Sequence, residues 1–281
     1  MVPNRRWSAG LSTWAGRAAI GGAVGALLCL FALPLLALLF RVPPASLLQR
    51  LGQPVVLEAV RLSLLTTAAA TCLVVLLGLP VAYLLAMRSF PGKRILEALI
   101  DLPMVLPPTV AGVGLLLAFG RAGLAGRVLA AGGISLPFTT AAVVLAQAFV
   151  AAPFFITTAA AGFREVEPRY LDAAATLRAR PGFALRHVLL PLSLPSLLAG
   201  AAMSWARALG EFGATITFAG NLPGRTQTMP LAVYIALQTD LDASVTLSVL
   251  LVLVSFSVLV LLRWAPGRLA TLRARAPRPA S

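Results

Sequence analysis

The sequence predicts an all-α integral membrane protein with about six transmembrane helices. Of its 281 residues, 59% are hydrophobic and only 11% are charged, whereas soluble domains carry roughly 25% charged residues. The mean hydropathy is +0.91. Several uncharged runs also reach the ~20 residues that an α-helix needs to cross ~30 Å of hydrocarbon.

Six stretches are predicted to span the membrane. The first, residues 18–40, is too long for the ~7–15-residue core of a signal peptide and lacks an evident cleavage site, so we expect it to remain as a span. The third opens with three prolines that should distort its helix. The segment 218–242 is mixed and turn-rich. The other predicted spans are residues 62–87, 102–120, 137–162, 193–217 and 243–262.

The basic residues predict how the chain is oriented. Six spans place both ends on one face, which then carries 16 of the 23 basic residues, in the N-terminus, residues 88–94, residues 163–191 and the tail from Arg263. The opposite face carries six, and Arg207 lies inside the fifth span. This asymmetry predicts that both termini are cytoplasmic. It also explains the net charge of +14 without invoking nucleic acid.

Few residues are available for catalysis or cofactor binding. Cys29 and Cys72 lie in apolar spans and form no CxxC pair, and His187 is the only histidine. A phosphate-binding G-x-x-x-x-G-K-[ST] loop is absent, so the chain is not expected to cradle ATP in that way. The sequence therefore predicts no enzyme, no metal site and no cofactor in this chain.

Residues 163–191 form the one strongly charged internal segment. They contain five of the 23 basic residues and three of the nine acidic residues. Because this segment lies between two spans, it must lie in water. Pro168 suits a first helical position, and Pro181-Gly182 should stop a helix. The pattern predicts a cytoplasmic helix over about 168–180, which is either an ordinary interfacial helix or a docking helix for a partner.

A motif in this segment resembles that of type I ATP-binding-cassette (ABC) importer permeases. The family carries Glu-Ala-Ala, three residues, Gly, nine residues and Ile-x-Leu-Pro. This chain has Asp172-Ala173-Ala174, three residues, Arg178, nine residues and 188–191 as Val-Leu-Leu-Pro. Arg178 replaces a glycine that permits a backbone turn which arginine resists. The helix therefore either ends near Arg178 or continues to Pro181.

The resemblance implies the type I importer permease fold and a coupling helix that docks on a separate ATPase subunit. Its expected contact residues are Asp172, Ala173, Ala174 and Leu177, with Arg178 beside them. The ATPase would bind ATP and Mg²⁺. The chain then divides into an N-terminus with the first span (1–55), a permease domain (56–262, with coupling loop 163–191) and a basic cytoplasmic tail (263–281).

Two further stretches resemble molybdate permeases: residues 101–112 and residues 206–238. Sulfate and thiosulfate permeases share the Gly-Glu-Phe/Tyr-Gly and Ala-Gly-Asn-x-Pro-Gly elements, but residues 226–231 fit the molybdate type better. The resemblance implies a homodimer in the bacterial inner membrane that works with a periplasmic oxyanion-binding protein. Tungstate is a possible cargo, and sulfate or thiosulfate is the alternative.

The fifth span contains polar residues that are candidates for a translocation path or gate: Ser204, Arg207, Glu211 and Thr215, followed by Asn221. Charged residues within spans are costly and usually face the bundle interior. Arg207 and Glu211 are four residues apart and can pair. They either line the path or form a structural ion pair that fixes helix packing. Glu211 is also the one clear acid that an ion-coupled carrier, a rival function, could use.

Overall fold

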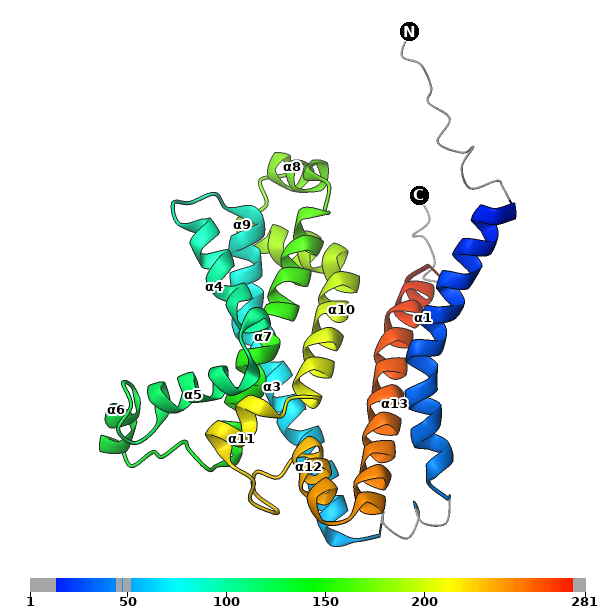
Figure 1. Cartoon of the computed structure of the whole chain (residues 1–281). Helices are drawn as coiled ribbons and strands as arrows, with labels where there is room; N and C mark the ends of the chain where they lie inside the picture. Colours follow the sequence, from blue (N-terminus) through cyan, green and yellow to red (C-terminus); the bar gives the residue numbers. More distant parts are fainter. Residues whose placement is uncertain (1–13, 44–46, 48–51, 275–281) are drawn as a thin grey trace.

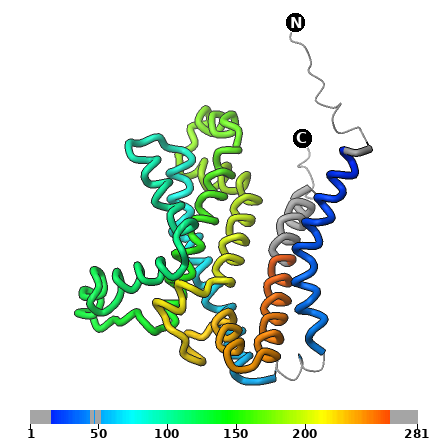
Figure 2. Tube along the Cα trace, in the orientation of Figure 1, coloured from blue at the N-terminus to red at the C-terminus, as the bar shows by residue number. Residues whose placement is uncertain are grey.

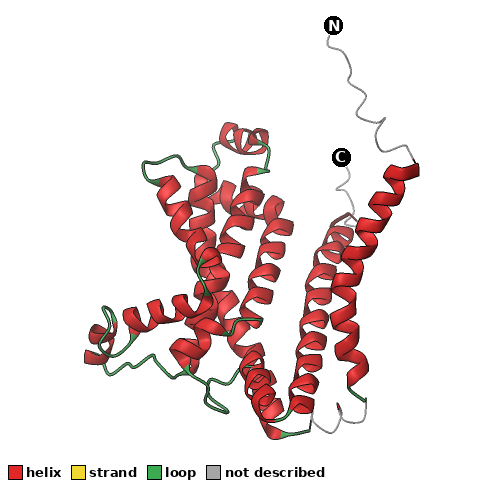
Figure 3. Cartoon of the chain, in the orientation of Figure 1, coloured by secondary structure: helices red, strands yellow, loops and turns green. Residues whose placement is uncertain are grey.

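The computed structural model describes residues 14–43, 47 and 52–274. The parts of the predicted N-terminus and basic tail that fall in residues 1–13 and 275–281 lie outside these residues. In the described part all regular structure is helical, and Figure 3 shows no strand there. Five helices are long and apolar enough to cross a membrane, or six if one bent helix pair counts as a single span. The predicted all-α membrane fold is therefore confirmed.

The elements follow one another as shown in Figure 1. They are α1 (Trp14–Arg41), α3 (Pro54–Met87), α4 (Lys93–Val105), α5 (Pro108–Phe119), α6 (Gly126–Ala131), α7 (Thr140–Arg164), α8 (Pro168–Thr176), α9 (Pro181–Ala184), the π-helical turn η2 (Leu185–Leu189), α10 (Leu190–Leu209), α11 (Gly213–Ala219), α12 (Met229–Thr239) and α13 (Leu241–Ala274).

Helices α3, α7 and α10 form the central bundle, with α7 packed against both others. Small residues allow these helices to approach closely. A Cβ at Gly78 of α3 would lie 2.9 Å from Ile156 Cγ1 of α7, and one at Gly162 of α7 would overlap Ser196 of α10. The fully buried Phe155 and Phe163 fill the core between the small residues.

The predicted third span, 102–120, is not one helix but two, since α4 and α5 are bent by 117° at a short break. Leu106 and Pro107 both have extended backbones (ψ 135° and 133°). Each of them precedes a proline, which disfavours the helical conformation of the residue before it. The sequence predicted a distorted helix here, and the distortion proves large enough to send α5 sideways from the bundle (Figure 1).

The predicted fifth span, 193–217, is also interrupted. Helix α10 ends at Leu209, and α11 begins at Gly213. Helix α11 crosses α5 very closely, because a Cβ at Gly112 would lie 2.9 Å from Ala214 O and one at Gly213 would lie 2.8 Å from Pro108 Cβ. The break therefore places α11 where it contacts the helix that follows the other bend.

The turn-rich segment 218–242 contains a helix that the sequence analysis did not identify, α12. Residues 223–226 form a turn in which the Thr226 N–H donates to Leu222 O (2.8 Å). Beyond it, Met229 N–H at the start of α12 donates to Ser63 Oγ of α3 (2.7 Å). This bond ties α12 to the central bundle.

Helices α1 and α13 lie side by side at the edge of the molecule (Figure 2). The most apolar part of α1 is not buried at all within the chain. Helix α13 extends beyond the predicted span 243–262, so the first part of the predicted tail is helical; residues 275–281 lie outside the described residues. Helix α1 begins and α13 ends at the end of the bundle where α8 lies (Figure 1).

Candidate functional site

The charged segment folds into α8, α9 and η2, which project from one end of the bundle (Figure 1). Pro168 is the first residue of α8, and Glu167 precedes it as the N-cap residue. Arg169 pairs with Glu167, and its guanidinium lies 5.0 Å from the centre of the Tyr170 ring. These contacts fix the N-terminal end of α8 and do not cover its apolar face.

Helix α8 ends at Thr176, four residues earlier than the predicted helix 168–180. Arg178 N–H donates to Ala175 O (2.9 Å) and Ala179 N–H donates to Ala174 O (3.0 Å). This is the hydrogen-bond pattern of a Schellman motif, which needs a left-handed residue just after the helix. Arg178 supplies it with φ 56°. Of the two predicted alternatives, the helix ends at the family's glycine position.

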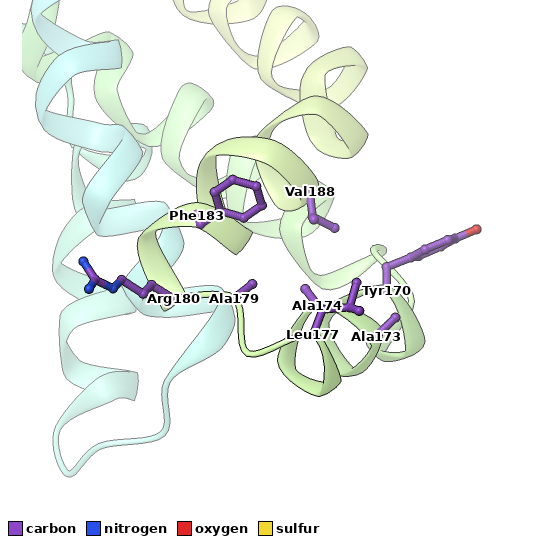
Figure 4. Close-up of a pocket in the computed structure, with 8 residues that line it drawn as sticks. All are labelled: Tyr170, Ala173, Ala174, Leu177, Ala179, Arg180, Phe183 and Val188. Atoms are coloured by element: carbon purple, nitrogen blue, oxygen red, sulfur yellow. The ribbon is translucent and has the colours of Figure 1, made fainter. Parts of the chain in front are cut away.

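A pocket of about 560 Å³ lies between α8 and the α9–η2 turn (Figure 4). Three predicted contact residues, Ala173, Ala174 and Leu177, line it, while Asp172 and Arg178 are exposed and do not. Leu177 is 83% exposed, which is unusual for a leucine in water. An exposed concave apolar surface of this kind is typical of a protein interaction site.

Sequence reasoning missed the other wall of this pocket. It contains Ala179, Arg180, Phe183 and Val188. The Phe183 ring of α9 stacks on the ring of His187 in the following π-helical turn, with 4.1 Å between the ring centres. Phe183 and Val188 could have been recognised from the sequence as candidate contact residues, because they are large apolar residues within the strongly charged segment 163–191.

The predicted path residues lie around the break between α10 and α11. Arg207 Nη2 lies 2.8 Å from Glu211 Oε2, so the predicted pair is present. Glu211 is only 1% exposed and lies in the break, not within a span helix as predicted. Its Oε1 accepts a hydrogen bond from Ala214 N–H (2.8 Å). The carboxylate therefore joins the end of α10 to the buried first turn of α11, whose N–H groups have no partner within the helix.

The neutral candidates near this break are buried without hydrogen-bond partners in the described part of the chain. Ser204 and Thr215 are both 0% exposed, and neither hydroxyl oxygen has a partner. Asn221 lies apart from them, in the turn after α11, and its Oδ1 also has no partner. Buried polar groups are normally hydrogen-bonded, so these groups are available to water or to a ligand.

Gln147 of α7 is a further polar residue that sequence reasoning missed. It is fully buried, and neither its Nε2 nor its Oε1 has a partner among the described residues. Contacts at Gly162–Ser196 and Gly200–Thr158 set the antiparallel register of α7 and α10. The neighbouring α7 residues Ala146 and Val150 pack in one buried cluster with Ala214 of α11, so Gln147 lies on the part of α7 that packs near α11. The sequence could have indicated Gln147 as a candidate, because it is a strongly polar residue within the long uncharged span 137–162.

The fold and these surfaces define a multi-pass helical membrane protein with an exposed apolar pocket at one end and a buried polar group of residues near the other. The sequence profile of the family "Binding-protein-dependent transport system inner membrane component" matches residues 75–269. The chain therefore belongs to this family of membrane transport components.

Within this family, the chain is similar to permease proteins of molybdenum, molybdate/tungstate and sulfate transport systems. The chain is 46% identical over 250 residues to the molybdenum transport system permease protein ModB of Mycobacterium tuberculosis, which covers 89% of this chain and 93% of the relative. It is 36% identical over 222 residues to the molybdate/tungstate permease protein WtpB of Thermococcus kodakarensis (79% and 83% covered). It is 36% identical over 232 residues to the sulfate permease protein CysT of Salmonella typhimurium (82% and 83%).

Solved structures support the fold. A bacterial ABC transporter involved in the import of alginate matches with a TM-score of 0.73 at 12% identity, covering 91% of this chain and 96% of that chain. The MetNI methionine ABC transporter matches with a TM-score of 0.59 at 22% identity (79% and 97% covered). At identities this low, the two structures support only the permease fold and say nothing about the cargo of this chain. This fold agrees with the one that the sequence predicted.

Arg178→Gly is expected to raise the free energy of unfolding by about 1 kcal/mol, because a left-handed backbone costs a side-chain-bearing residue ~1–2 kcal/mol and costs glycine little. Thermal unfolding of the purified protein in detergent measures this. Arg180→Gly is the matched control, since Arg180 has φ −65° and gains nothing from glycine. If Arg178 serves only as a helix terminator, ATP-driven uptake is unchanged or improved. A loss of uptake without loss of stability would instead show that its guanidinium contacts the partner.

Proposed function

We propose that this chain is the permease subunit of an ATP-driven importer that carries molybdate or tungstate across the bacterial inner membrane. The observation that supports this most strongly is the 46% identity to a molybdenum permease protein over 89% of the chain. The matched length is large enough to include both the pocket at α8 and the polar residues around α11. The sulfate permease protein matches less closely, at 36%.

In this proposal the α8–α9 surface docks on a separate ATPase subunit, which binds ATP and Mg²⁺. The apolar pocket and the exposed Leu177 provide area that becomes buried on docking. Arg178, Arg180 and Arg186 add a positive charge that favours an acidic partner surface, while Arg169 is already paired with Glu167. With this surface in the cytoplasm, the end of the bundle at which α1 begins and α13 ends is cytoplasmic too.

The polar residues near α11 suit the transit of an oxyanion. An anion that must be released is better served by neutral hydrogen-bond donors than by a free arginine, which would tend to hold it. The hydroxyl groups of Ser204 and Thr215 are unpartnered donors, while Arg207 is neutralised by Glu211. A second copy of the chain and a periplasmic binding protein that delivers the anion complete the proposed transporter.

The proposal predicts which anions compete for uptake. Liposomes containing the permease, its ATPase subunit and the binding protein are expected to accumulate labelled molybdate only when ATP is present. Unlabelled tungstate in tenfold excess should suppress this uptake, because its size and charge are so similar, whereas a hundredfold excess of sulfate should leave at least half of it.

Equal competition by sulfate would assign the chain to sulfate transport. Uptake driven by a proton gradient in liposomes that lack the ATPase would point to an ion-coupled carrier and overturn the proposal.

A further inference from the structure

Arg164 ties three helices together at the point where the bundle meets the charged segment. It is the last residue of α7. Its Nη2 donates to Leu85 O of α3 (3.1 Å) and to Glu97 Oε1 of α4 (3.1 Å). Leu85 lies in the last turn of α3, where carbonyl groups lack partners within the helix and favour a cation. A single guanidinium therefore connects the entry of the α8 segment to α3 and α4.

Beside this ion pair lies a cavity of about 280 Å³. Its lining residues are Leu85, Glu97, Ile100, Asp101, Thr157, Ala160 and Arg164. Asp101 Oδ1 is buried and has no hydrogen-bond partner among the described residues. Glu97 and Asp101 are four residues apart on α4, so they lie on one helix face about 6 Å apart along the axis. The Arg164 guanidinium thus binds the Glu97 carboxylate and lines the same cavity as Asp101, whose Oδ1 has no hydrogen-bond partner among the described residues.

The ion pair between Arg164 and Glu97 is a weak constraint on the helices, because the two side chains are 49% and 35% exposed. Pairs of this exposure add little to stability in water. An unpartnered buried carboxylate oxygen, by contrast, is unfavourable. Moving the guanidinium from Glu97 to Asp101 exchanges a charge-assisted contact with a partly exposed carboxylate for one with a buried carboxylate oxygen, and the cavity provides the space for the movement. Two such alternative positions, one helical turn apart, are a known form of bistable element.

We propose that Arg164 is a positioning residue that exchanges Glu97 for Asp101 when the α8 segment moves, so that the end of α7 advances about one turn along α4. The inference rests on the proposed transport function. Helix α4 leads through the 117° bend into α5, and α5 contacts α11 at Gly112. The exchange therefore transmits a displacement at the docking surface to the break that holds Glu211.

Asp101→Asn tests the proposal, because Oδ1 of Asp101 has no hydrogen-bond partner among the described residues in the present state and a purely structural role for Arg164 does not involve it. In liposomes containing the complete transporter, D101N is expected to reduce ATP-driven molybdate uptake at least tenfold while ATP hydrolysis stays within twofold of wild type. Asp101→Glu, which keeps the carboxylate, should retain uptake within threefold. Arg94→Met, which removes an exposed cation from the same helix, is the control and should resemble wild type.

Wild-type uptake by D101N would overturn the proposal, and so would equal losses in D101N and D101E, which would indicate a packing effect at position 101. A parallel fall of hydrolysis and uptake would also contradict it, since that indicates failed assembly. Failure of the proposed function is a separate outcome. In that case the wild-type transporter itself takes up no molybdate, and the same variants are compared with whichever anion it does carry.

Discussion

Arg207→Met is expected to lower the free energy of unfolding by about 3 kcal/mol and to reduce uptake severely. The change leaves the carboxylate of Glu211, which is 1% exposed, with no cation beside it. Removing one partner from a buried ion pair typically costs 3–5 kcal/mol, and Arg207 is partly exposed, which places the expected value at the lower end. Unfolding of the purified protein in detergent and uptake in liposomes measure the two effects.

The double variant Arg207→Met/Glu211→Gln distinguishes structure from transport. Glutamine carries no charge and can still accept the hydrogen bond from Ala214 N–H. If the pair mainly fixes the break between α10 and α11, the double variant recovers most of the lost stability and part of the uptake. Recovery of stability without any recovery of uptake would show that the charges act separately on the anion or on the gate.

Gly112→Ala is expected to destabilise the protein by about 2 kcal/mol and to impair uptake about tenfold. Its new Cβ would lie 2.6 Å from Thr217 Cβ and 2.9 Å from Ala214 O. The second neighbour is backbone and cannot move alone, so α5 and α11 must separate. Inserting a methyl group into such a contact typically costs ~1–3 kcal/mol.

Gly114→Ala is the matched control for this contact. It lies on the same helix, two residues further on, and an added Cβ would meet nothing within 4 Å. Both changes gain the same helix propensity of up to about 1 kcal/mol. Gly114→Ala should therefore be neutral or stabilising, and a similar loss in both variants would contradict the assigned crossing of α5 and α11.

The sequence predicted the long helices well, because hydrocarbon imposes the same length and apolar composition on each. The predicted span 137–162 corresponds closely to α7, and the predicted span 62–87 matches α3 except that the helix begins eight residues earlier, at Pro54. Prolines also indicated a distortion after residue 102. The 117° bend was not predictable, because its size depends on where α11 holds α5, and that contact joins residues about a hundred positions apart.

The candidate sites were predicted only where the signal is local. Ala173, Ala174 and Leu177 were found because a short motif with fixed spacing identifies the helix that carries them. Phe183 and Val188 complete the same pocket, but their position opposite α8 depends on how the chain folds back after Thr176, which the Pro181-Gly182 stop signal alone does not specify. Arg207 and Glu211 were paired correctly, although the break that buries Glu211 was missed because the surrounding residues remain apolar.

The π-helical turn at Leu185–Leu189 has a consequence for how this region tolerates insertions and deletions. A π-turn accommodates one residue more than an α-helical turn between the same two ends. Deleting one residue there restores an α-helical turn and leaves the residues on both sides in place, whereas an insertion that no bulge absorbs rotates everything before it by about 100° relative to α10, since an α-helix has 3.6 residues per turn. Only such a rotation would take Phe183 out of the pocket wall that faces Leu177. The π-helical turn is therefore the place where this region tolerates the loss of one residue.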